Sequence, residues 1–221
     1  MAHTDEHNRR TGRRPRVLLA SRSPRRREML TKAGIDHIAE HPGLDDAELA
    51  PTTRGVEAYV ASLAFLKAAA GAVLPQSAGV DVVLGADTAC EQSGTIIGTP
   101  TTEDEAYHMV RSLSGGEHRV FSGVALVGTW DGRRVIFVDK ARVSLGRLSE
   151  DEIRTYVASG EWRGKAGGYN LSERLAAGWP IEHSGDPTTI MGLPMRRLVP
   201  LLDAWNDHVS PLRRSSGESV S

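Results

Sequence analysis

Residues 17–27 have the sequence Val-Leu-Leu-Ala-Ser-Arg-Ser-Pro-Arg-Arg-Arg, in which an apolar run passes directly into a helix start. Four consecutive apolar residues are typical of a buried strand. Ser23 suits the N-cap of a helix and Pro24 its first turn, so we expect a helix over residues 24–33 that ends at Gly34. A strand followed at once by a helix is typical of an α/β protein.

The alternation of strands and helices continues along the chain. A second apolar strand is predicted over residues 80–84, and a hairpin over residues 120–127 and 135–145. Thr102 and Ser149 are each followed three residues later by glutamate, which predicts two further helix starts. A longer helix is predicted over residues 55–74, and its apolar face is expected to consist of Val56, Tyr59, Val60, Leu63, Leu66 and Ala70.

The composition is that of an ordinary globular chain. The 221 residues include 27 Lys+Arg and 28 Asp+Glu, and this balance argues against a general nucleic-acid binder. We expect one domain over residues 16–205, between a disordered arm (residues 1–15) and a disordered tail (residues 206–221). There is no apolar run long enough for a membrane span, and the single cysteine, Cys90, fits a reducing compartment, so the expected location is the cytoplasm.

The first candidate site is the predicted helix start with its serines and arginines. Free backbone N–H groups at a helix N-terminus, together with hydroxyls and guanidinium groups, suit a phosphate. The side chains that would contribute are Ser21, Ser23, Arg25 and Arg26. The alternative is a capped helix with a solvated basic face.

Acidic residues supply the second candidate site. Asp87, followed by Thr88, comes after the predicted strand over residues 80–84, where a carboxylate could hold a divalent metal or activate water. Asp46 belongs to an acidic pair in a predicted loop and could add the hard oxygen ligands that magnesium prefers. The alternatives are an aspartate that turns the chain and a solvated acidic pair.

The third candidate is a glycine-rich stretch around Lys165. Gly164, Gly167 and Gly168 lie close to this lysine, which suggests backbone brought near a ligand with the ammonium group as a point charge for phosphate. Only four of the 27 cations are lysines, which makes a lysine at this place more informative. A flexible surface loop is the alternative.

Seven segments in sequence order resemble the Maf family of nucleoside triphosphate pyrophosphatases. They run from Leu18 to about Leu202 and cover most of the chain. The segments are residues 19–26 with 28–30, Leu63-Ala64 with Lys67-Ala68, Gly85-Ala-Asp-Thr88, Leu113-Ser-Gly115, Ser122-Gly-Val-Ala-Leu126, Gly164-Lys-Ala-Gly-Gly-Tyr169 and Gly192-Leu-Pro194.

The resemblance implies a fold and a reaction. The fold would be a mixed β-sheet flanked by helices with a central cleft, related to the inosine triphosphate pyrophosphatases and commonly homodimeric. The reaction would be hydrolysis between the α- and β-phosphates of a standard or modified nucleoside triphosphate, with magnesium or manganese. Asp87 would be the proton acceptor and, with Asp46, the metal neighbourhood. Phosphate contacts would come from Ser21, Ser23, Arg25, Arg26, Lys67 and Lys165.

Several positions bear on the base. Arg25 and Thr88 resemble members that act on dTTP and UTP more than those that act on 7-methyl-GTP. The dTTP/UTP-type members have Gly-Ile-Gln after the tyrosine, whereas this chain has Asn170-Leu171-Ser172, so the residue expected to contact the base there is Ser172. Many relatives also have a lysine where this chain has Thr99.

Members of the family are also linked to septum formation and cell-division arrest. A non-catalytic, nucleotide-binding regulator is therefore the alternative to an enzyme. The missing lysine favours the regulator, whereas the presence of Asp87, Lys67 and Lys165 together favours the enzyme.

Overall fold

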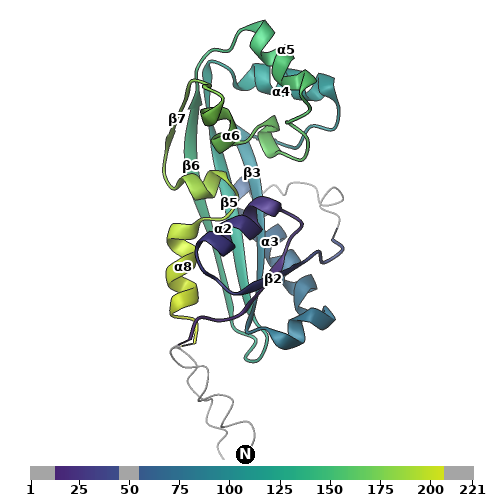
Figure 1. Ribbon diagram of the computed structural model, residues 1–221, viewed down its shortest axis with the longest axis vertical. Helices are drawn as coiled ribbons and strands as arrows, with labels where there is room; N and C mark the ends of the chain where they lie inside the picture. Colours follow the sequence, from purple (N-terminus) through teal and green to yellow (C-terminus); the bar gives the residue numbers. More distant parts are fainter. Residues whose placement is uncertain (1–12, 45–54, 207–221) are drawn as a thin grey trace, which may run out of the picture.

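A seven-stranded mixed sheet forms the centre of the described part of the protein. The computed structural model describes residues 13–44 and 55–206. The strands are β1 (Val17–Ala20), β2 (His37–Glu40), β3 (Val82–Gln92), β4 (Thr95–Ile97), β5 (Gly116–Gly128), β6 (Arg134–Leu145) and β7 (Ile181–Ser184). Their order is β2-β1-β3-β5-β6-β7, with β4 paired to β3 (Figure 1). β1 runs parallel to β2 and β3, and the other pairs are antiparallel.

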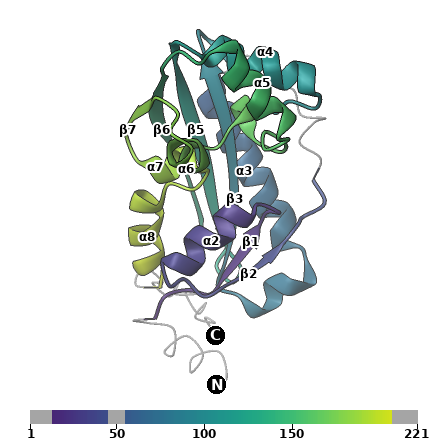
Figure 2. The same ribbon diagram turned by 45° about the horizontal axis from the view of Figure 1, so that its top comes forward.

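Helices cover both faces of this sheet, as the alternating pattern predicts. They are α2 (Pro24–Lys32), α3 (Val56–Ala72), α4 (Glu103–Leu113), α5 (Glu150–Ala158), α6 (Leu171–Ala176), α7 (Pro187–Ile190) and α8 (Met195–Asp203), with short 3₁₀ turns η2 (Pro75–Gly79) and η3 (Ala166–Gly168). Ser23 caps α2, and Ser149 with Glu152 forms the capping box of α5. In Figure 2, α2 and α8 lie in front of the strands and α3 lies behind them. The predicted mixed sheet with flanking helices is confirmed.

The long helix α3 packs unusually close to the sheet, and two glycines make this possible. A Cβ atom on Gly85 would lie 2.1 Å from the Ala64 carbonyl oxygen, and one on Gly123 would lie 2.3 Å from that of Val60. The helix accordingly faces the sheet with small residues as well as large ones, namely Val60, Leu63, Ala64, Ala68 and Gly71. Leu66, which we expected on this face, is 38 % exposed.

The strand that carries Asp87 is longer than its sequence predicts. We expected it to end at residue 84, before a turn, but β3 continues to Gln92 and Asp87 pairs with Gly123 of β5 in mid-strand. Because Gly85 serves the contact between helix and sheet, it does not mark a turn. The expectation that Asp87 lies beyond a strand end is therefore wrong.

A gap in the strand pairing creates the place for a site. On one side, β1 pairs with β3 as far as Leu84, and β4 pairs with β3 from Cys90 onward. Between them, residues 85–89 of β3 have no strand neighbour on that side among the described residues. The core divides at the same level: one apolar cluster joins α2 and α8 to the sheet, and another joins α4 and α5 to its far end (Figure 1). Asp87 thus lies between two separately packed halves.

Candidate active site

Two adjoining cavities open at this gap. The larger, of about 560 Å³, contains the cationic side chains Arg22, Arg25, Lys67, Arg163 and Lys165, together with Ser21 and Ser23. The smaller, of about 190 Å³, contains Arg26, Asp87 and Thr88 beside apolar side chains of Val120, Ile190 and Met191. Ser23, Arg25 and Gly164 belong to both cavities, which makes them one continuous cleft. The fold therefore brings together all but two of the site residues that the sequence predicts; the exceptions are Asp46 and Ser172.

Asp87 forms an ion pair with a lysine of α3. Lys67 Nζ lies 2.7 Å from Asp87 Oδ1, and each side chain is 12 % exposed. In the strand register Asp87 stands opposite Gly123, whose missing side chain leaves room on the face toward α3. Lys67, which the resemblance assigns to phosphate, is therefore also the partner of the expected proton acceptor.

The neighbouring arginines Arg25 and Arg26 differ in their environments. Arg26 Nε donates to the Gly192 carbonyl at 2.8 Å, and its two terminal nitrogens donate to the Ala86 carbonyl at 2.8 Å and to Thr88 Oγ1 at 3.0 Å. Arg25, in contrast, has no hydrogen-bond or salt-bridge partner among the described residues, and its Nε is buried. The geometry favours Arg25 as a ligand-binding cation, whereas Arg26 ties α2 to β3 and to the Gly192 loop.

Thr88 belongs to a chain of hydroxyl groups with a fixed direction. Ser122 Oγ donates to the Thr189 carbonyl at 2.8 Å, so the hydrogen in the 2.8 Å contact between Thr88 and Ser122 must come from Thr88. Thr88 Oγ1 also accepts from Arg26. The Thr88 hydroxyl can therefore only accept a hydrogen bond from a ligand in the cavity.

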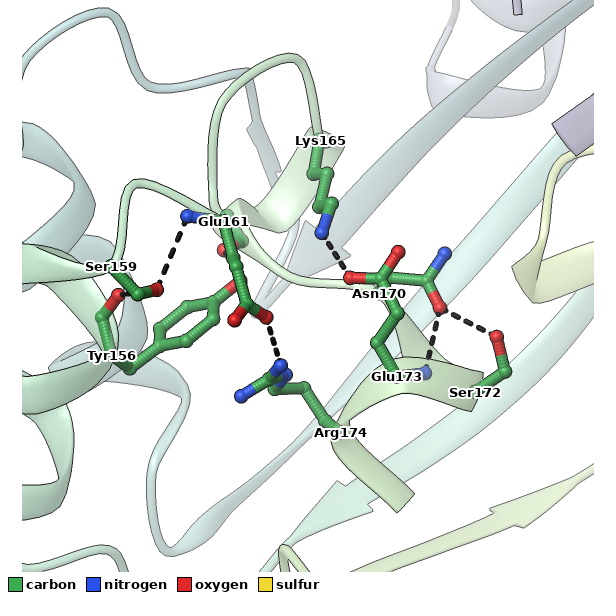
Figure 3. A network of polar contacts seen from close by, with 9 residues as sticks. Tyr156, Ser159, Glu161, Lys165, Asn170, Ser172, Glu173 and Arg174 are labelled. Atoms are coloured by element: carbon green, nitrogen blue, oxygen red, sulfur yellow. Dashed lines mark hydrogen bonds and ion pairs between the residues drawn. The ribbon is translucent and has the colours of Figure 1, made fainter. Parts of the chain in front are cut away.

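The glycine-rich loop is fixed by bonds to its surroundings. Gly164, Gly167 and Gly168 have positive φ values of 68°, 73° and 75°. Gly167 N–H donates to the Gly98 carbonyl at 3.0 Å. The Tyr156 hydroxyl donates to the Gly168 carbonyl at 2.8 Å. Lys165, 11 % exposed, forms an ion pair with Glu173 of α6 (Figure 3). The alternative of a flexible surface loop does not describe this arrangement.

Ser172 does not line either cavity. It is exposed, and its hydroxyl donates to Asn170 Oδ1 at 2.7 Å (Figure 3). The expected contact of Ser172 with the base is therefore not supported by its position, because the N-terminus of α6 turns this side chain toward the cap. Asn170 lines the smaller cavity instead and is 5 % exposed. The sequence signal that could have found it was the departure from the pattern of relatives at residues 170–172.

Comparison with known proteins gives the family. A family model described as "Maf-like protein" matches residues 16–205. The chain belongs to the Maf family. A relative from Pelotomaculum thermopropionicum is 37 % identical over 193 residues, covering 87 % of this chain and 98 % of its own. A relative from Aromatoleum aromaticum is 41 % identical over 204 residues, covering 86 % of this chain and 95 % of its own. Both are named dTTP/UTP pyrophosphatase.

Among solved structures, the Ham1 protein of Staphylococcus aureus matches this Maf protein with a TM-score of 0.39 and 15 % identity, over 59 % of this chain and 71 % of that one.

Within the described residues of the Maf chain, every helix is too short or too polar to span a bilayer.

Neutral polar groups also line the smaller cavity of this Maf protein, and two of them, His118 and Tyr169, were not among the predicted site residues. His118 Nε2 lies 2.6 Å from the Tyr169 hydroxyl. Burial lowers the pKa of His118 to about 4 and raises the pKa of Tyr169, so both are uncharged near neutral pH. Burial also raises the pKa of the Cys90 thiol to about 12, and this side chain packs among the buried apolar residues.

The expected metal site is only partly within the structure. Asp46 lies outside the described residues, and in the parts that are described no three His, Cys, Asp or Glu side chains cluster to hold a metal. Magnesium is commonly held by one or two carboxylates, with phosphate oxygens and water as the other ligands. The single carboxylate of Asp87, next to a cationic cavity, fits that kind of site.

Proposed function

We propose that this Maf protein hydrolyses the bond between the α- and β-phosphates of dTTP or UTP, releasing a nucleoside monophosphate and pyrophosphate. The observation that carries the proposal is the position of the Asp87 and Lys67 pair where the larger, cationic cavity meets the smaller one. The names of the relatives from Pelotomaculum and Aromatoleum support the same reaction and the same bases.

The charge distribution sets the orientation of the substrate. A triphosphate needs cations, which line the larger cavity, and a planar base suits apolar walls with a few polar groups, which line the smaller one. The α-phosphate then lies between them, next to Asp87. Arg25 and Lys165 would hold the β- and γ-phosphates and stabilise the pyrophosphate as it leaves.

Asp87 would act as the base. Its carboxylate takes a proton from a water molecule as the water oxygen forms a bond to the α-phosphorus. The bond from that phosphorus to the bridging oxygen breaks, and its electron pair leaves with pyrophosphate. Lys67 holds the Asp87 carboxylate in place through their 2.7 Å contact. A bound magnesium or manganese ion, held by Asp87 and by Asp46, would neutralise phosphate charge.

The test is to incubate the wild type and Asp87→Asn with a panel of nucleoside triphosphates, including 7-methyl-GTP, in magnesium or manganese. We expect monophosphate and pyrophosphate from dTTP and UTP, and loss of turnover in the variant by on the order of 10²- to 10⁴-fold. Orthophosphate as product would indicate a different reaction. Full turnover in Asp87→Asn would exclude the role of this residue.

The regulatory alternative is favoured by Thr99, which lines the smaller cavity at the position where the resemblance leads us to expect a lysine. Tight nucleotide binding by the wild type without any turnover would support that alternative and a role in septum formation.

We also propose a cytoplasmic homodimer, for which light scattering on the purified chain measures the molar mass.

A further inference from the structure

Asn170 is a buried polar residue whose hydrogen-bonding groups are only half used. It is the N-cap of α6, and its Oδ1 accepts from Glu173 N–H at 3.1 Å and from the Ser172 hydroxyl at 2.7 Å (Figure 3). A backbone N–H can only donate, so the oxygen of the side-chain amide must face the helix. The Nδ2 amino group is therefore on the opposite side.

This amino group is available to a ligand. Asn170 is 95 % buried and lines the smaller cavity, and no hydrogen-bond partner of Nδ2 lies within the described residues. The residue is buried as a whole, but Nδ2 itself stays accessible at the cavity wall. The acceptor for Nδ2 would come from whatever fills the cavity.

The location of Asn170 indicates a base rather than a phosphate. Asn170 lines only the smaller cavity, together with His118 and Tyr169, both uncharged near neutral pH. Of the cations at the wall of this cavity, Arg26 is hydrogen-bonded within the protein and Arg25 also lines the larger cavity. The cations Lys67, Arg163 and Lys165 line the larger cavity. We propose that Asn170 determines base specificity by donating from Nδ2 to a carbonyl oxygen of uracil or thymine. This inference rests on the proposed function.

Thr88 provides the complementary group in the same cavity. Its hydroxyl gives its hydrogen to Ser122, so its oxygen can only accept from a base. Uracil and thymine carry a C=O next to an N–H, which matches one donor and one acceptor. Cytosine carries an amino group next to an unprotonated nitrogen, and so presents two groups of the wrong polarity. A buried site of fixed polarity rejects such an analogue.

The test uses two substitutions that retain the helix cap. Asn170→Asp keeps an oxygen for Glu173 N–H but replaces the donor by an acceptor, and Asn170→Ser keeps a capping oxygen without the amino group. Ser149→Asp adds the same charge at the cap of α5, which lines neither cavity, and serves as the matched control. The measurement is kcat/KM for UTP and for CTP, with product identification and thermal unfolding of each variant.

We expect both Asn170 variants to lower kcat/KM for UTP by about 10- to 100-fold while that for CTP stays level or rises. The control should leave the ratio of UTP to CTP unchanged. An equal fall for both nucleotides, or an unchanged ratio, would overturn the assignment, since a structural or phosphate-binding role affects both alike. If the wild type releases pyrophosphate from no nucleotide, the proposed function fails. The Asn170 assignment is then judged on the affinities for UMP and CMP, measured by calorimetry, where the same ratio decides it.

Discussion

Lys67 Nζ and Asp87 Oδ1 lie 2.7 Å apart, with one residue on helix α3 and the other in the middle of strand β3. The contact is short because Gly85 and Gly123 allow the helix backbone to reach the sheet. The close packing of α3 therefore determines the geometry of the expected catalytic base.

Removing one member of this pair should destabilise the protein. Lys67→Met leaves the Asp87 carboxylate buried with its charge uncompensated, and we expect a loss of about 3–5 kcal/mol in the free energy of unfolding. The double variant Lys67→Met/Asp87→Asn should recover much of that loss but remain inactive. Urea unfolding measures both. Lys140→Met, at an exposed lysine, is the control and should change stability by less than about 1 kcal/mol. A double variant no more stable than Lys67→Met would show that the charge is not the cause.

Replacing Gly85 by alanine should disturb the same contact. The new Cβ would lie 2.1 Å from the Ala64 carbonyl oxygen and 2.5 Å from the Ala68 nitrogen, so α3 must move away from the sheet. We expect a loss of about 3 kcal/mol in stability or more, and a fall in kcat as Lys67 shifts. Gly79→Ala, where the nearest neighbouring atom would be 4.0 Å away, should stay within about 0.5 kcal/mol of the wild type. Equal stability of the two variants would contradict the packing argument.

Stability should fall in mild acid because of His118. Burial lowers its folded-state pKa to about 4, below the value of about 6.5 in an unfolded chain. The unfolded state therefore binds the proton first, so this contribution is fully present above about pH 6.5 and is lost as the pH falls toward 4, by up to about 1.4 kcal/mol per pH unit. His118→Gln should make the free energy of unfolding depend less on pH. His183→Gln, at an exposed histidine, should leave that pH dependence unchanged. Unfolding free energies at pH 7 and pH 5 measure the difference.

Thr99→Lys tests the position at which the resemblance leads us to expect a lysine. Thr99 is exposed at the wall of the smaller cavity, which also contains Asp87, so a lysine there adds a cation on the side of the site where we propose that the α-phosphate lies. We expect KM for UTP to fall by about 2- to 5-fold at low salt, and the effect to weaken as ionic strength rises. Thr99→Met supplies a side chain without the charge. A similar change in KM for both variants would mean that charge at this position has no role.

The sequence by itself determined the parts of this protein that depend on neighbours in the chain. Ser23 and Ser149 mark helix starts because a capping hydroxyl bonds to N–H groups two or three residues away. The glycine-rich loop around Lys165 and the arginines of α2 could likewise be recognised from local patterns, and the family follows from their order.

Only the tertiary structure decided what these residues contact. Asp87 lies in mid-strand because β5 pairs with β3 along residues 82–91, a long-range pairing that a local pattern does not contain. Of two adjacent arginines, Arg26 is bound by Gly192, 166 residues away in sequence, and Arg25 is left for a ligand. Asn170, instead of Ser172, faces the cavity because the cap of α6 fixes the direction of both side chains. Spacing indicates which residue types come close to the site, but packing between distant segments determines which of their atoms remain available to the substrate.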